Sequence, residues 1–190
     1  SPSDFPLARI DQEALDRVLA GETAVEDLYP LSPLQEGILF ESLVDGDPEI
    51  YFEQLGYRLQ GPLDPAAFRE AWRSVLARHP VFRTTFLWDG LDRPLQLVRR
   101  GAELAWSEED WRSEPEGSRR ERLEAFLRRD RRAGFDLARP PLTRFALLRL
   151  AEEEHFFVWS HHHLLLDGWC LGLIVQEVFQ LYRSAVDGGP

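Results

Sequence analysis

The sequence predicts an α/β fold, a layered lobe in which helices flank a mixed β-sheet. Segments with strand-like alternation of apolar residues and segments with helical periodicity follow one another along the chain. Hydrophobic residues make up 44% of the 190 residues and aromatic residues 12%, which is enough for one sizeable core. No glycine-rich nucleotide-binding loop and no internal repeat interrupts this pattern.

Residues 1–26 are predicted to form a linker with one short helix, and residues 27–190 the folded lobe. Asp11 is a suitable N-cap for the short helix, and Gly21 ends it. We expect a chain with such a start to be part of a longer polypeptide. A stronger helix signal follows, in which Ser32 and Gln35 form a capping box around a proline at the first helical position. This helix is expected from Pro33 to about Leu43.

The middle of the chain is predicted to alternate between strands and a helix. Residues 51–59 have strand periodicity, and Asp64 followed by proline then opens a helix that ends near His79. Residues 81–88 are expected to form a strand that turns at Asp89-Gly90 into a second strand around residues 95–98.

The last third is predicted to contain a hairpin between two helices. Residues 101–118 are expected to be irregular, and residues 119–132 to form a charged amphipathic helix. Residues 142–150 and 155–162 should pair as a hairpin, and the last helix should run from Gly168 to about Ala185.

Composition excludes several classes of function. A formal net charge of −11 argues against a nucleic-acid binder, because phosphate recognition needs clustered positive charge. All 22 cationic residues are arginines, so no Schiff base or P-loop chemistry that needs a lysine is available. Cys170 is the single cysteine and fits a core position in a reducing compartment. Without a membrane-spanning run or a signal-peptide core, we expect the chain in the cytoplasm.

Three consecutive histidines, His161 to His163, are the densest group of potentially catalytic side chains. If the strand continues through them, alternation places His161 and His163 on one side and His162 on the other. The three imidazoles then do not converge, which disfavours a zinc site, and His79 and His155 lack ligand spacing.

The residues of this segment also have structural interpretations. Asp167 is well placed to cap the last helix. His162 and His163 fit equally well as polar residues satisfied at the end of a core strand. Spacing alone leaves these alternatives open.

The segment from His161 to Gly168 resembles the His-His-x-x-x-Asp-Gly signature of the condensation domains of nonribosomal peptide synthetases. These domains belong to the wider chloramphenicol-acetyltransferase-like acyltransferases. The segment from Tyr29 to Gly37, Tyr-Pro-Leu-Ser-Pro-Leu-Gln-Glu-Gly, is similar to the first motif of that family. Arg-His-Pro-Val-Phe-Arg-Thr-Thr-Phe, from Arg78 to Phe86, is similar to the second. Three motifs in family order are far more specific than one.

The resemblance implies a reaction and a division of roles. The amine of an aminoacyl group on one carrier domain attacks the thioester of a peptidyl or acyl group on the upstream carrier. His163 is implied as the catalytic base or as a positioning group, with His162 in a supporting role. Asp167 is implied to be structural, normally through a buried ion pair with an arginine of the second lobe. Gly168 is expected to let the backbone turn closely beside the histidine.

Two further polar residues are expected to be structural. Arg83, on the same predicted strand face as Val81 and Leu87, is expected to be an internal charge that needs a partner. His79, in the same motif, is also interpreted as structural.

The resemblance also implies partners. No cofactor is expected to bind directly; phosphopantetheine arms of upstream and downstream peptidyl carrier domains present the substrates, and an adenylation domain is adjacent. The chain corresponds to the N-terminal lobe only, so its C-terminal lobe is missing and the lobe alone is expected to be inactive. The motifs are most similar to the subtype that accepts a D-configured donor.

Two other functions share this motif pattern. An epimerisation domain has the same histidines and aspartate, although its first motif normally differs from the one present here. A non-catalytic relative that recruits partner proteins is the other alternative, although such relatives usually lose the motif histidines.

Overall fold

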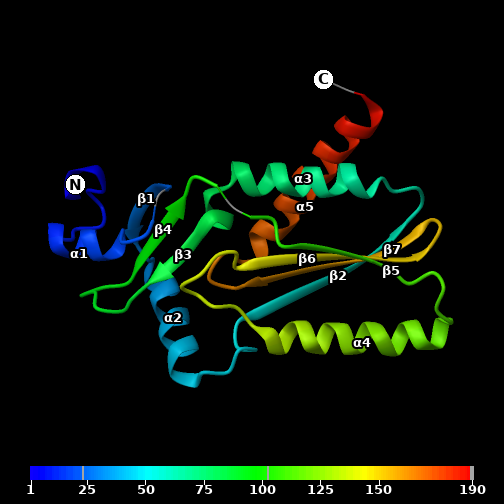
Figure 1. The fold of residues 1–190 in the computed structure, drawn as a ribbon, viewed down its shortest axis with the longest axis horizontal. Helices are drawn as coiled ribbons and strands as arrows, with labels where there is room; N and C mark the ends of the chain where they lie inside the picture. The colour runs from blue at the N-terminus through cyan, green and yellow to red at the C-terminus, as the bar shows by residue number, and fades with distance from the viewer. Residues whose placement is uncertain (23, 102, 189–190) are drawn as a thin grey trace.

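The computed structural model describes residues 1–22, 24–101 and 103–188, and its centre is a four-stranded β-sheet (Figure 1). The strand order is β2 (Phe52–Gln60), β7 (Glu154–His162), β6 (Thr143–Ala151) and β5 (Trp106–Asp110). The pairs β2–β7 and β7–β6 are antiparallel, whereas β5 is parallel to β6. The predicted α/β lobe with a mixed sheet is therefore confirmed.

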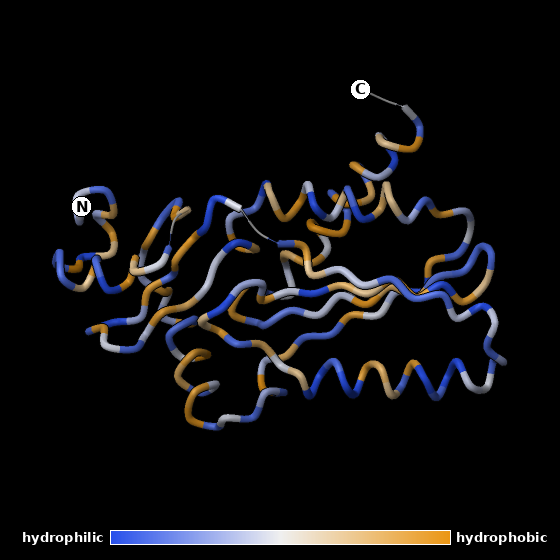
Figure 2. Tube along the Cα trace, in the orientation of Figure 1, coloured by the Kyte–Doolittle hydropathy of each residue, from blue (hydrophilic) through white to orange (hydrophobic). Residues whose placement is uncertain are grey.

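Helices cover both faces of this sheet. α3 (Pro65–Arg78) and α5 (Gly168–Asp187) lie on one face, and α4 (Glu116–Ala133) runs along the other (Figure 1). Successive β7 side chains point to opposite faces, so Phe157 and Trp159 join the first core while Val158 joins the second. α4 is mainly hydrophilic with recurring apolar residues (Figure 2), as expected for a helix that buries one stripe.

Aromatic residues fill the core beneath α3. The ring of Trp72 lies with its centroid 4.6 Å from that of Phe145 and 4.9 Å from that of Trp159. Such close aromatic pairs add stabilisation beyond the area they bury. This core includes Trp159 of β7, two residues before the first of the three histidines.

A second, three-stranded antiparallel sheet lies to one side of the large one (Figure 1). Its order is β1 (Val25–Pro30), β4 (Leu95–Arg99) and β3 (Thr84–Leu87). The N-terminal segment, with η1 (Pro2–Asp4) and α1 (Gln12–Val18), packs on this sheet through buried residues. The shared cluster includes Ala8, Leu15, Leu28, Leu95 and Leu97.

Two of the remaining predictions are wrong in detail. The strand expected over residues 81–88 starts only at Thr84, because η2 (Pro80–Arg83) is a 3₁₀-helix with Phe82 N bonded to His79 O at 3.1 Å. Residues 101–118 are not all irregular, since they include β5. Strand β1 was also not predicted, and it begins within residues 1–26.

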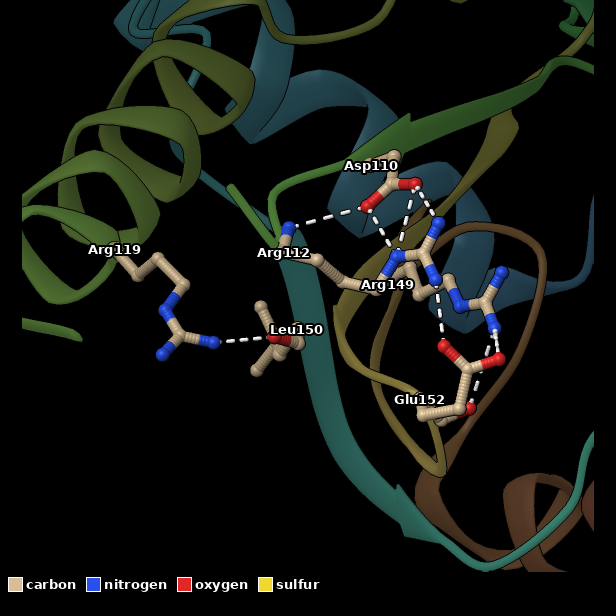
Figure 3. Close-up of polar contacts among 6 residues, drawn as sticks. All are labelled: Asp110, Arg112, Arg119, Arg149, Leu150 and Glu152. Carbon is tan, nitrogen blue, oxygen red and sulfur yellow. Dashed lines mark hydrogen bonds and ion pairs between the residues drawn. The ribbon is translucent and has the colours of Figure 1, made fainter. Parts of the chain in front are cut away.

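Polar contacts explain why β5 forms without an apolar pattern (Figure 3). Arg112 Nε donates to Asp110 at 3.0 Å, and Arg112 Nη1 donates to Glu152 at 2.6 Å. Arg149 also donates to Glu152, at 2.8 Å. The hydrogen bonds from Arg112 lower the pKa of Asp110 to about 2. These contacts join β5 to the β6–β7 turn, at the end of the sheet opposite the histidines.

Among the described residues, no helix is both long and apolar enough to cross a membrane.

Candidate functional site

The three histidines lie where β7 ends, but in different environments. β7 includes His161 and His162, whereas His163 follows its last residue. The strand alternation that we expected for all three therefore does not extend to His163. A short turn of three buried leucines then leads to Asp167 and α5.

His161 is buried on the aromatic side of the sheet. Its ring centroid is 5.2 Å from that of Trp159, and neither ring nitrogen has a hydrogen-bond partner. Burial lowers the pKa of His161 to about 4, because the surroundings disfavour the charged imidazole. This side chain is neutral at pH 7 and remote from solvent.

His162 is also buried but is hydrogen-bonded. Its Nδ1 accepts the backbone N–H of Leu164 at 3.2 Å, which orders the turn after the strand. Burial lowers the pKa of His162 to about 4 as well. The same residue lines a pocket of about 270 Å³ together with Leu43, Ile50, Trp88 and others.

His163 is the accessible member, with 34% of its side chain exposed. Its backbone N–H donates to Tyr51 O at 2.9 Å. Its ring lies parallel to that of Tyr51, with a centroid distance of 6.2 Å and an interplanar angle of 5°. Its Nδ1 is 4.0 Å from Glu53 Oε1. An accessible imidazole beside a carboxylate can accept a proton or a hydrogen bond from a ligand.

The sequence did not indicate Tyr51 or Glu53 as part of the site. They lie more than one hundred positions before His163, and only the register of β2 against β7, with Phe52 opposite His162, brings them there. The one local signal in the sequence was that Tyr51 is the first residue of a predicted strand.

The first sequence motif lies against the histidine segment. It spans the end of β1 and the start of α2 (Pro33–Asp45), and Gln35 Nε2 donates to Leu164 O at 3.1 Å. Further along α2, Glu41 accepts a hydrogen bond from the hydroxyl of Tyr51. α2 therefore contacts both the turn after the histidines and the tyrosine that stacks on His163.

Asp167 caps α5 and is exposed. Its Oδ1 accepts the N–H of Trp169 at 3.0 Å and that of Cys170 at 3.1 Å. Hydrogen bonds from Cys170 are the main cause that lowers the pKa of Asp167. No ion pair of Asp167 occurs within the described part of the chain.

The close turn expected at Gly168 is not present. Gly168 is the first residue of α5, its φ lies outside the left-handed region, and a Cβ added to it would meet no atom within 4 Å. The turn beside the histidine is instead made by the leucines, so this position does not require glycine in the described lobe.

Arg83 lies in η2, so the strand face on which we placed it does not exist. Its side chain is almost completely buried, and Nη1 donates to Glu26 at 2.5 Å and to the carbonyl of Arg99. The hydrogen bond to Glu26 is the main cause that lowers the pKa of that carboxyl. Arg83 thus joins η2 to β1 and β4.

His79 lies at the end of α3, where its Nε2 is 2.6 Å from Glu177 of α5. Arg78 donates to the same carboxylate at 2.5 Å. Burial opposes ionisation of Glu177, but the bonds from His79 and Arg78 outweigh it and lower its pKa. The contact joins α3 to α5 away from His163.

Across residues 1–22, 24–101 and 103–188, no three His, Cys, Asp or Glu side chains gather as a potential metal site.

Comparison with known proteins bears directly on this arrangement. A family model described as "Condensation domain" matches residues 25–190. The chain is 40% identical over 191 residues to a linear gramicidin synthase protein of Brevibacillus parabrevis, covering 99% of this chain and 2% of that protein. It is 42% identical over 188 residues to a second linear gramicidin synthase protein of the same organism, with 99% and 4% covered. The chain thus spans a small fraction of these relatives.

Solved structures show the same fold. The starter condensation domain of rhizomide synthetase superposes with a TM-score of 0.78 at 24% identity, over 87% of this chain and 41% of that one. The first condensation domain of the calcium-dependent antibiotic synthetase gives a TM-score of 0.75 at 23% identity, over 86% and 40%. The sequence match and the shared fold establish that this chain belongs to the condensation domain family, as the three motifs predicted.

Proposed function

We propose that this lobe supplies one wall of a site that forms peptide bonds in nonribosomal peptide synthesis. The amine of a carrier-bound aminoacyl group attacks the thioester carbonyl carbon of an upstream carrier-bound peptidyl or acyl group. A C–N bond forms, the C–S bond breaks, and the sulfur leaves on the phosphopantetheine arm of the upstream carrier. The amine nitrogen loses one proton in the process.

The accessible imidazole of His163 carries this proposal. It is the one motif histidine that combines solvent access with a nearby carboxylate, while His161 and His162 are buried and have lowered pKa values. His163 either takes the proton of the attacking amine or holds the amine by a hydrogen bond. His162 supports it from within the turn, through the bond to Leu164.

Asp167 is assigned a structural role as the N-cap of α5, in which Gly168 is the first helical residue. Asp167 fixes the start of α5, and an arginine of the second lobe is its further partner in the complete domain. Arg83 and His79 are assigned to scaffolding, because their contacts join secondary-structure elements at a distance from His163.

We also propose that the isolated lobe is inactive and that its partners complete the site. The solved relatives contain more than twice the length that this chain matches, consistent with a second wall in the rest of the domain. Upstream and downstream carrier domains would bring the two arms, and an adjacent adenylation domain would load them. The motif residues favour a donor with a D-configured terminal residue.

The test uses the complete synthetase with its carrier domains loaded. We expect His163→Ala to slow amide formation at least a hundredfold, since general acid–base catalysis contributes that much. A pH–rate profile of His163→Gln then separates the two roles, because glutamine donates and accepts hydrogen bonds but takes no proton. An acidic limb that persists unchanged in His163→Gln contradicts the base role.

Mass analysis of carrier-bound products distinguishes condensation from epimerisation. Condensation lengthens the acyl group on the downstream carrier, whereas epimerisation leaves its mass unchanged. Full activity of His163→Ala would overturn the proposed function.

A further inference from the structure

A tyrosine with a strained backbone lies directly against the His163 ring. Tyr51 has φ 56°, a left-handed conformation that few non-glycine residues adopt. Such strain costs on the order of 1 kcal/mol and persists where the surrounding structure imposes it, often at functional sites. Tyr51 contacts His163 twice, since its carbonyl accepts the His163 N–H and its ring stacks on the imidazole.

The Tyr51 ring is itself held in place. Its hydroxyl donates to Glu41 of α2, and this carboxylate raises the pKa of the tyrosine, so the hydroxyl stays protonated and donating. α2 is also bonded to the turn after the histidines through Gln35, so hydrogen bonds at two places on one helix link the ring to that turn. These contacts favour one position of the stacked ring relative to that turn.

A carboxylate lies near Nδ1 of the same imidazole. Glu53 is two residues after Tyr51, and its Oε1 is 4.0 Å from His163 Nδ1. This distance is too long for a direct hydrogen bond but short enough for the carboxylate to attract the polar N–H of an Nδ1-protonated ring. Since Nδ1 is the ring nitrogen recorded beside Glu53, Nε2 is the nitrogen left for a reacting group. The carboxylate would favour this ring orientation.

We propose that Tyr51 and Glu53 are positioning residues for His163: the stacked ring fixes the plane of the imidazole, and the carboxylate selects which nitrogen faces the substrate. This inference rests on the role proposed above for His163. It assigns to β2 a part in the reaction that none of the three sequence motifs includes.

The experiment measures the single-turnover rate of amide formation in the complete synthetase, with both carriers loaded. We expect Tyr51→Leu to slow it about tenfold, because a poorly oriented group loses much of its catalytic advantage. Tyr51→Phe keeps the ring and should recover the rate to within about threefold of the unchanged protein. Glu53→Gln, which keeps the shape but removes the charge, should slow it about threefold.

Matched controls come from the same strand pair. Tyr57→Leu removes a β2 tyrosine that stacks on Phe157 in the core, with ring centroids 6.5 Å apart. Glu154→Gln removes a β7 carboxylate that accepts from Arg58 at 2.7 Å. Both controls should keep the rate within about twofold. Thermal midpoints and carrier loading are recorded for every variant.

The outcomes separate the two proposals. A full rate in His163→Ala contradicts the proposed function itself. If His163→Ala is slow but Tyr51→Leu and Glu53→Gln match their controls, only the positioning role is overturned. If Tyr51→Leu does not fold, Glu53→Gln still decides, because its side chain is 48% exposed and its replacement is isosteric. If Tyr51→Phe does not recover the rate, the proposed positioning role of the stacked ring is also contradicted.

Discussion

His161 and His163 are two residues apart, yet the fold gives them opposite chemical properties. His161 lies against Trp159 with both ring nitrogens unpaired, and burial lowers its pKa to about 4. His163 is one third exposed, stacks on Tyr51 and has its Nδ1 4.0 Å from Glu53 Oε1. The difference teaches that a histidine-rich motif does not act as a unit. Access and partners decide which imidazole can exchange protons with a ligand.

The largest expected effect is on catalysis. In the complete synthetase, His163→Ala should slow amide formation at least a hundredfold, whereas His161→Leu should change it less than threefold. The reason is that His161 has no route to a substrate through the aromatic core. Single-turnover rates on loaded carriers test this contrast. A comparable loss in both variants would show that the buried ring also takes part.

The second largest effect is expected on the stability of the fold at acidic pH. His161 and His162 have folded-state pKa values of about 4, below the unfolded value of about 6.5. As pH falls through this window the unfolded chain binds protons first, so the free energy of unfolding decreases. The stabilising contribution of each imidazole is fully present above about pH 6.5. Between pH 7 and pH 5, the free energy of unfolding should fall by roughly 2 kcal/mol for each imidazole.

Denaturant unfolding of this chain at the two pH values measures that loss. The two imidazoles make the free energy of unfolding lower at pH 5 than at pH 7. His161→Leu should remove about half of that difference. Unaltered acid sensitivity in His161→Leu would mean that this ring is charged in the folded state.

A third contrast concerns stability at neutral pH. His162→Ala opens a cavity and leaves the buried N–H of Leu164 without its acceptor, so we expect a loss of about 2 kcal/mol. His163→Ala removes a partly exposed ring and should cost less than about 1 kcal/mol. Urea midpoints at pH 7.5 give both values. The reverse order would place the structural role on His163.

The smallest effect is expected at the cap of α5. Asp167→Ala should lower the free energy of unfolding by about 1 kcal/mol, because Asp167 accepts two backbone N–H groups there. Asp167→Asn keeps an acceptor and should lose only a few tenths. Asp64→Ala, at the equivalent cap of α3, is the matched control and should resemble Asp167→Ala. A much larger loss at Asp167 would indicate a role beyond capping.

Local chemistry made several parts of the fold predictable. The capping box of Ser32 and Gln35 is present with both hydrogen bonds, and α2 begins at Pro33 as expected. Asp11 and Asp64 cap their helices through side-chain oxygens in the same way. The hairpin of β6 and β7 also follows the predicted pattern. In each case the signal and the structure lie within a few residues.

The strands that the sequence did not predict depend on partners far away in the chain. β5 is an edge strand of mostly polar residues, and it forms because it pairs with β6 and because Arg112 joins Asp110 to Glu152. β1 exists through its pairing with β4. No local periodicity reports such pairing, and the sequence of β5, Trp-Ser-Glu-Glu-Asp, has no alternation of apolar and polar residues.

The sequence by itself determined the family, the order of most helices and strands, and the segment that holds the site, because motifs and caps are local patterns. The tertiary structure decided which histidine is accessible. The β2–β7 register brings Tyr51 and Glu53 to His163, while the aromatic core excludes solvent from His161. Burial and charge proximity are properties of packed surfaces, so three identical side chains in a row acquire different properties only when the chain folds.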